Sequence, residues 1–168
     1  MKAGIKSKLF LVILLATVAL GMGSDVTNFK LLNLRNQQVE LATLLKDGPV
    51  LLDFWSTWCK PCIKAFPKLN ALHKKYGEKG LTVVGINEDG ARSQSKVKPF
   101  VRSLRIKFPI LIDNNNEVMR RLQVQSLPTT ILIAPNGMIV ARHVGYSPAG
   151  IKKLEERIVT LLREYANR

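Results

Sequence analysis

The order of three segments between residues 50 and 86 restricts the fold of this chain most strongly. The run Val50–Trp55 is apolar except for Asp53, and Leu81–Ile86 is a second apolar run. Continuous runs of this kind are typical of central strands that are covered on both faces. Between them, apolar residues recur every three or four positions from Lys60 to Lys79 opposite a line of lysines, which indicates an amphipathic helix. This order predicts a right-handed βαβ unit with parallel strands.

The rest of the chain supplies further elements for the same sheet. Asn136-Gly137 between two apolar runs indicates a β-hairpin. The remaining expected strands span 29–34, 109–113, 129–134 and 138–144, and the remaining expected helices span 41–45, 97–104, 117–122 and the region after Pro148. Together these elements predict an α/β fold in which helices cover both sides of one central mixed sheet.

The first 23 residues differ in composition from the rest. Three lysines precede an apolar run at 9–20, and the small residues Gly21, Gly23 and Ser24 follow it. This arrangement is typical of a secretory signal peptide, and the run is shorter than the roughly 20 apolar residues of a full membrane span. A retained N-terminal membrane anchor is the alternative. We therefore expect one domain at 24–168, exported to the periplasm or to the extracytoplasmic face of the membrane.

The chain is strongly basic. Its net charge is +14, and loss of the three lysines before residue 9 would leave +11, because no acidic residue precedes Asp25. Such a domain associates readily with acidic surfaces, although scattered lysines and arginines also serve solubility alone. No run of like charges or nucleic-acid-binding motif is present, so we expect no nucleic-acid partner. We expect a monomer.

Only two cysteines are present, Cys59 and Cys62. Their spacing cannot join distant segments, so a local role is expected, either redox chemistry or metal binding. A structural zinc site needs about four ligands. His73 and His143 could complete such a set, but neither has finger-like spacing from the cysteines. We therefore expect a redox pair that needs no metal and no other cofactor.

The position of the pair between a buried strand and a helix assigns a role to each cysteine. The helix N-terminus favours a negative charge, so Cys59 should have a lowered pKa and act as the nucleophile. Cys62, one turn later, can resolve a mixed disulfide. Pro61 suits a first helical turn because it lacks an N–H. Trp58 precedes Cys59, and Lys60 and Pro61 lie between the cysteines. All three are expected to contact the substrate, although packing is the alternative for Trp58 and solvent screens Lys60.

Several blocks of the chain resemble the thioredoxin superfamily, and specifically its exported TlpA/ResA-like branch. The similarity spans roughly Phe29 to Leu162, and the segment 88–107 resembles the insertion that separates this branch from plain thioredoxins. The blocks are Leu52-Asp53-Phe54-Trp55, Trp58-Cys59-Lys60-Pro61-Cys62, Phe66-Pro67, Phe108-Pro109 and Leu127-Pro128-Thr129-Thr130. The resemblance implies a thioredoxin-like fold, protein thiols or disulfides as substrates, and an electron donor in the membrane or periplasm.

The resemblance also implies roles for three residues outside the pair. Pro128 would be a cis-proline that faces the cysteines, and Leu127 would offer its backbone to an extended substrate; an ordinary proline at a strand entry is the alternative. Asp53 would be the buried acid that relays a proton at the second cysteine, or else the partner of a nearby lysine. The branch often carries Glu three residues after the second cysteine, where this chain has Ala65.

Four functions can be compared with these residues. The first is an exported reductase of protein disulfides, for example in cytochrome c maturation. An oxidase or isomerase of folding proteins shares the motif and differs in reduction potential. A peroxidase using Cys59 lacks the expected Thr-x-x-Cys setting, and a thioredoxin-like binding module would have no need of the intact pair.

Overall fold

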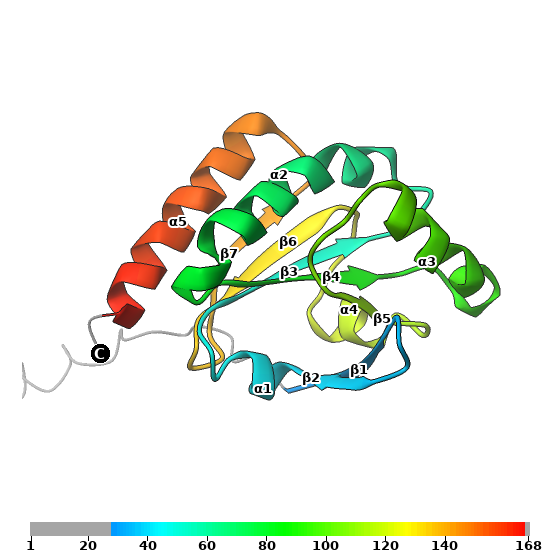
Figure 1. Ribbon diagram of the computed structural model, residues 1–168, viewed down its shortest axis with the longest axis horizontal. Helices are drawn as coiled ribbons and strands as arrows, with labels where there is room; N and C mark the ends of the chain where they lie inside the picture. Colours follow the sequence, from blue (N-terminus) through cyan, green and yellow to red (C-terminus); the bar gives the residue numbers. More distant parts are fainter. Residues whose placement is uncertain (1–27, 167–168) are drawn as a thin grey trace, which may run out of the picture.

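The computed structural model describes residues 28–166, so the expected signal peptide or anchor at 1–23 lies outside the described residues (Figure 1). The described chain forms one seven-stranded mixed sheet with the strand order β2-β1-β5-β4-β3-β6-β7. The strands are β1 (Lys30–Asn33), β2 (Gln38–Glu40), β3 (Val50–Trp55), β4 (Thr82–Asn87), β5 (Ile110–Ile112), β6 (Thr129–Ile133) and β7 (Ile139–Val144).

The centre of the sheet is the unit expected from the two apolar runs. β3 and β4 are parallel, with Asp53 opposite Gly85, and α2 (Lys60–Tyr76) connects them. β6 pairs with the other edge of β3 in antiparallel orientation, and β7 follows β6 as the second strand of the expected hairpin. All six residues of β3 are buried, which explains the continuous apolar run.

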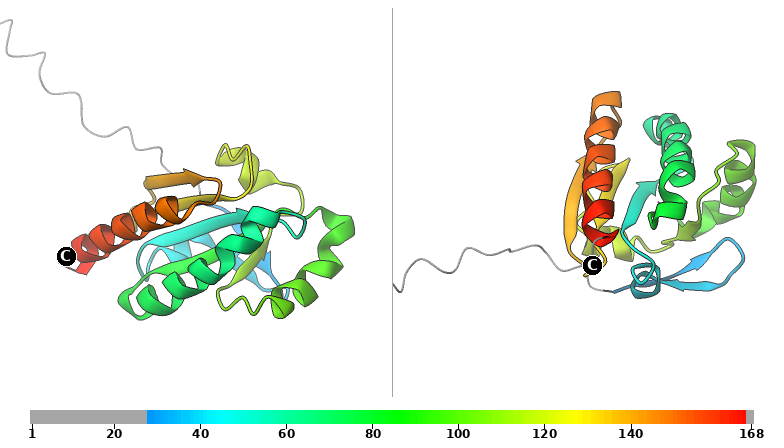
Figure 2. Two further views of the ribbon diagram at one scale, coloured as in Figure 1. Left: turned by 90° about the horizontal axis from the view of Figure 1, so that it is seen from above. Right: turned by 60° about the vertical axis from the view of Figure 1, so that its left-hand side comes forward.

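Helices cover both sides of the sheet (Figures 1 and 2). Side chains of α2, α3 (Gln94–Ser103) and α5 (Pro148–Ala166) pack in one apolar cluster with Leu51, Trp55 and Val83. Side chains of α1 (Leu41–Leu44) and α4 (Glu117–Arg121) pack in a second cluster on the opposite side, with Leu52 and Phe54. Odd and even positions of β3 thus face different helices, as the period of a strand requires.

The structure departs from the expected elements in three places. β2 is an additional strand: Gln-Val-Glu carries no strand pattern, yet it pairs with β1 across a turn held by the Asn33 side chain. α2 ends at Tyr76, and the 3-10 turn η2 (Gly77–Lys79) follows it and stops at Gly80, whose φ is 98°. α3 begins at Gln94, after a second 3-10 turn, η3 (Ala91–Ser93), so it is longer than its apolar face indicates.

A helix that spans a bilayer needs roughly 20 predominantly apolar residues. Within residues 28–166, no helix is both long and apolar enough to cross a membrane.

The tight packing beside the redox segment makes a first prediction. A Cβ at Gly85 would lie 2.6 Å from Ile110 Cδ1 and 2.9 Å from Trp55 Nε1. Both neighbours are buried, so Gly85→Ala should lower the free energy of unfolding by about 1–3 kcal/mol through overpacking. Urea unfolding of the oxidised protein measures this, with Gly90→Ala as the control because nothing lies within 4 Å of its added Cβ. Equal effects of the two substitutions would contradict the prediction.

Candidate redox site

The loop between β3 and α2 places Cys59 at the start of the helix. The Cys59 N–H donates to Ser56 O at 3.1 Å, which closes a turn. Cys59 is the N-cap residue of α2, and its Sγ accepts a hydrogen bond from the Cys62 N–H at 3.3 Å. Pro61 lies in the first turn and has no N–H of its own. The Cys62 amide, one of the free amides of the first helical turn, is therefore directed at the sulfur of Cys59, where it stabilises a thiolate after reduction.

Cys59 and Cys62 form a disulfide, with their Cα atoms 5.3 Å apart. Cys59 is 4% exposed and Cys62 is completely buried. Only the first cysteine can be reached by a substrate sulfur, so the geometry separates an attacking cysteine from an interior one. The described residues contain no cluster of three side chains suited to hold a metal ion.

Asp53 lies inside β3, six residues before Cys59. Its side chain is fully buried, and neither carboxylate oxygen has a hydrogen-bond partner among the described residues. The alternative in which Asp53 pairs with a lysine is therefore wrong. Burial raises the pKa of the Asp53 carboxyl well above its ordinary value of 3.8.

The strand period directs Asp53 to the side of the sheet that carries α2. Leu51 and Trp55, two residues away in either direction, both belong to the apolar cluster that contains Cys62. The ladder neighbours of Asp53 are Gly85 and Thr130, and neither carries a charge. A carboxyl of raised pKa thus faces the layer in which Cys62 is buried, which suits an exchange of protons with that cysteine.

Glu88 is a second buried acid, and no motif in the sequence singles it out. Its backbone N–H donates to Trp55 O at 2.8 Å, so it lies at the carboxyl end of β4 beside the end of β3. Both of its carboxylate oxygens are buried without a partner among the described residues. Burial raises the pKa of Glu88 to about 9; the charge of Asp113 adds to this, and Arg120 opposes it. Its burial follows from the pairing of β4 with β3, which the local sequence around Glu88 does not indicate.

Asp89 holds the loop that leads to Cys59. Its carboxylate accepts hydrogen bonds from the Thr57 N–H and from Thr57 Oγ1, both at 2.8 Å. Asn87 Nδ2 donates to the same carboxylate at 2.7 Å, and Asp89 is 2% exposed. Thr57 is thereby fixed two residues before the nucleophile. No sequence pattern indicates this link, because the two partners lie 32 positions apart.

The loop before β6 lies beside the same end of β3. The Leu127–Pro128 peptide bond is cis, the geometry that the family resemblance implies. Thr129 pairs with Phe54, so Pro128 is level with the end of β3, where the loop to Cys59 begins. Leu127 is partly buried against both apolar clusters. The sheet register thus brings Leu127 and Pro128 to the carboxyl end of β3, where the loop that leads to the cysteines begins.

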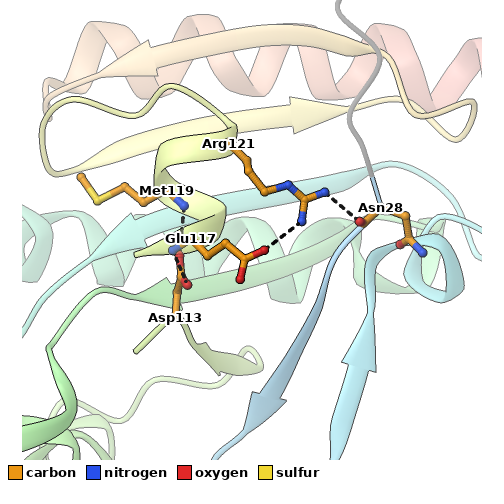
Figure 3. Close-up of polar contacts among 5 residues, drawn as sticks. All are labelled: Asn28, Asp113, Glu117, Met119 and Arg121. Carbon is orange, nitrogen blue, oxygen red and sulfur yellow. Dashed lines mark hydrogen bonds and ion pairs between the residues drawn. The ribbon is translucent and has the colours of Figure 1, made fainter. Parts of the chain in front are cut away.

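α4 precedes this loop and is fixed at its start (Figure 3). Asp113 Oδ1 accepts from the Glu117 N–H at 2.9 Å, and Asp113 Oδ2 accepts from the Met119 N–H at 3.0 Å. Arg121 donates to Asn28 O at 3.0 Å and lies 3.5 Å from the Glu117 carboxylate. These contacts join α4 to β5 and to the start of the described chain, so the segment that continues to Pro128 has a rigid support.

The two tryptophans near the pair differ in environment. Trp58 is 70% exposed, the position expected for contact with a substrate. Trp55 is fully buried, edge-on to Phe66 at 5.0 Å and stacked on Phe100 at 6.0 Å, so it belongs to the core. Lys60 is exposed, His73 lies near the C-terminal end of α2, and His143 lies on β7 opposite Thr130.

A mixed sheet with a disulfide at the start of a helix, a buried acid behind it and a cis-proline beside it defines a class. This class is the thioredoxin-like thiol–disulfide oxidoreductases. The chain belongs to the AhpC/TSA family, whose model matches residues 22–142. Its enzymatic activity is thiol–disulfide exchange.

Relatives and solved structures agree with this class. The chain is 37% identical to the thiol-disulfide oxidoreductase ResA of Bacillus cereus over 124 residues, which cover 74% of this chain and 70% of that protein. ResA of Bacillus subtilis is 37% identical over 118 residues, covering 70% and 64%. A Chlorobium tepidum structure assigned as a thiol:disulfide interchange protein DsbE has a TM-score of 0.77 at 32% identity, covering 83% of this chain and 96% of that one. StoA of Bacillus subtilis shares the fold, with a TM-score of 0.65 at 23% identity over 78% of this chain and 96% of that one.

The environment of Asp53 makes a prediction about the pH dependence of reactivity. If Asp53 accepts the proton of Cys62, the rate at which Cys62 resolves a mixed disulfide at Cys59 should rise as Asp53 ionises. Asp53→Asn should flatten this profile and slow the step about 100-fold, the lower end of the range for general-base catalysis. Stopped-flow measurement of the resolution step across pH tests this. An unchanged profile would exclude the proton role.

Stability offers an independent check on the same substitution. Above pH 3.8 the unfolded chain loses the Asp53 proton, whereas the folded protein keeps it until its raised pKa is reached. The folded state then binds more protons, so the free energy of unfolding of the wild type falls as pH rises through this window. Asp53→Asn should therefore gain stability over the wild type as pH rises, as followed by guanidinium unfolding. Exposed Asp47→Asn is the control and should show no such trend.

The Asp89 contacts make a separate prediction. Asp89→Ala leaves the Thr57 N–H and hydroxyl without their acceptor and should lower the free energy of unfolding by about 1–3 kcal/mol. It should also slow the attack of Cys59, because the loop before it is released. Thr57→Val removes one of the two hydrogen bonds and should give a smaller change of the same sign. Unaltered Cys59 reactivity in a folded Asp89→Ala protein would refute the role of this clamp.

Proposed function

We propose that the protein is an exported reductase of protein disulfides. Support comes from one observation above all: the interior cysteine shares its buried layer with the Asp53 carboxyl, which has no hydrogen-bond partner within residues 28–166. A dithiol that reduces a substrate must remove the Cys62 proton inside the protein, and Asp53 is a base placed for this. Burial raises the pKa of the Asp53 carboxyl, which makes its carboxylate a stronger base toward the thiol proton than an exposed one.

The reaction proceeds in two exchanges. The Cys59 thiolate attacks one sulfur of the substrate disulfide, so that a Cys59–substrate disulfide forms and the first substrate sulfur leaves as a thiolate, which takes a proton from water. Cys62 then gives its proton to Asp53 and attacks Cys59 Sγ. The Cys59–Cys62 disulfide forms and the second substrate thiolate leaves. The substrate gains two electrons, which a thiol donor in the membrane or periplasm restores to the protein.

The compartment follows from the sequence and from the chemistry. The basic, apolar and small-residue order of residues 1–24 supports export, with or without a retained anchor. Outside the cytoplasm thiols become oxidised, so proteins that need free thiols, such as apocytochromes c before haem attachment, require a dedicated reductant. Maturation of c-type cytochromes is therefore the pathway we propose.

The direction of electron flow is decided by the reduction potential of the Cys59–Cys62 pair. Equilibration with glutathione should give a value near that of thioredoxin, about −270 mV, and not near the −120 mV of a strong oxidant. A value at the oxidising end would assign the protein to the oxidation or isomerisation of folding proteins.

Trapping identifies the substrate. Cys62→Ser should accumulate mixed disulfides through Cys59 in the source cell, whereas Cys59→Ser should accumulate none. A folded Cys62→Ser protein that traps nothing would favour a binding module.

A further inference from the structure

Two neighbouring helical segments beside Cys59 carry basic residues without any acidic ones. α2 contains five lysines and no Asp or Glu. The segment from Gly90 to Ile112, which includes α3, contains three lysines and three arginines and again no Asp or Glu. Mixed signs are the ordinary state of a solvated helix face, so this one-sided composition calls for an explanation.

The structure joins the two segments into one surface. Asn70 of α2 donates through Nδ2 to Arg105 O at 3.1 Å and accepts from the Lys107 N–H at 2.9 Å. The ring centroids of His73, on α2, and Phe108 lie 6.4 Å apart, in an edge-on arrangement. The chain that follows α3 is therefore fixed against the middle of α2, and the helices lie on one side of the sheet (Figure 2).

We call the side chains of Lys60, Lys64, Arg102, Arg105 and Lys107 the basic surface. All five are exposed, and none forms an ion pair within residues 28–166. It begins at Cys59, because Lys60 is the next residue and Lys64 lies one turn further along α2.

The two segments that carry this surface contain no acidic residue, and several acids elsewhere in the described chain are buried. Among the acids within residues 28–166, Asp53, Glu88, Asp89 and Asp113 are buried. Asp89 lies nearest to the loop, and its carboxylate is directed inward to Thr57 and Asn87. By contrast, α5 mixes both signs, and its Glu155 pairs with Lys75 at 2.7 Å. The excess positive charge therefore lies along α2, from Lys60 beside Cys59 to the chain held at Asn70.

We propose that the basic surface recruits a protein partner whose disulfide is flanked by acidic residues. A partner sulfur must approach Cys59 past Trp58 and along the start of α2, so that acidic neighbours of that sulfur meet the basic surface. Complementary charge around a docking site raises association rates by about 10- to 1,000-fold at low salt. A membrane laid on the same surface would cover Cys59, which disfavours a lipid as the occupant.

This inference rests on the thiol–disulfide exchange of the proposed function but not on its direction. The probes are three disulfide-bridged peptides of equal length whose cystine is flanked by Glu, Lys or Ser. The second-order rate constant for their reduction by the reduced full chain is measured by stopped flow at low and high salt. At low salt the Glu peptide should react roughly 10-fold faster than the Ser peptide and the Lys peptide more slowly, and high salt should remove the differences.

A matched pair of variants assigns the effect to this surface. Lys64→Glu/Arg102→Glu/Lys107→Glu should abolish or invert the preference for the Glu peptide. Lys152→Glu/Lys153→Glu/Arg163→Glu changes the net charge equally on exposed positions of α5 and should keep the preference. Lys60 is left intact because it belongs to the redox motif.

The outcomes separate the two proposals. Reduction of the Ser peptide without an advantage for the Glu peptide would overturn the docking inference alone, and equal losses in both triple variants would do the same. Failure to reduce any peptide would overturn the proposed function with it. Two results together would assign the surface to a membrane and overturn a protein partner. The full chain would show no preference among the peptides, and it would bind phosphatidylglycerol vesicles in a way that only the α2/α3 triple variant loses. The N-terminal segment is identical in all variants, so it cancels in this comparison.

Discussion

β3 lies between two strands and two layers of helices with all of its residues buried, and the position of each redox group depends on this constraint. Pairing with β4 and β6 fixes its register, so that Asp53 must face the α2 side between Gly85 and Thr130. A shift of the pairing by one residue would turn every side chain of β3 to the opposite face of the sheet. Asp53 would then face α1 and α4 instead of α2. The end of β3 also fixes where the loop to Cys59 begins, and the first turn of α2 then directs the Cys62 amide at the sulfur.

Three buried acids surround this point, and their environments give them different chemistry. Asp53 and Glu88 have no hydrogen-bond donors among the described residues, so burial raises the pKa of both carboxyls and favours their neutral forms. Asp89 receives three hydrogen bonds and serves as an acceptor that fixes Thr57. A donor-free carboxyl costs stability when it ionises, whereas a bonded one stabilises the loop that holds it. The site therefore combines proton chemistry behind Cys62 with a rigid approach to Cys59.

Local patterns in the sequence are sufficient to predict the central βαβ unit, the β6–β7 hairpin and the redox pair, because strand period, helix period and Cys-x-x-Cys spacing are all short-range signals. β2 is not predicted, because the three residues Gln38-Val39-Glu40 are too few to show a strand period. Its pairing with β1 depends on the turn that the Asn33 side chain holds. Glu88 and Asp89 look like the start of a polar loop. Their burial follows from the register of β4 against β3, a contact between segments more than 30 positions apart that no local pattern encodes. The tie between Asn70 and the chain after α3 is of the same kind.

The arrangement separates the chemistry from the choice of partner. Cys62 and Asp53 are sealed in the interior, so the proton and electron transfers between them depend little on what docks outside. Trp58 and the basic surface are exposed, so they meet each partner before any bond changes, at distances over which salt and charge act. Substitutions on α2 and α3 can therefore alter which disulfides arrive without disturbing the buried pair that reduces them. The segment 88–107 contributes to both parts, since Asp89 at its start positions the nucleophile and the basic residues at its end face the partner.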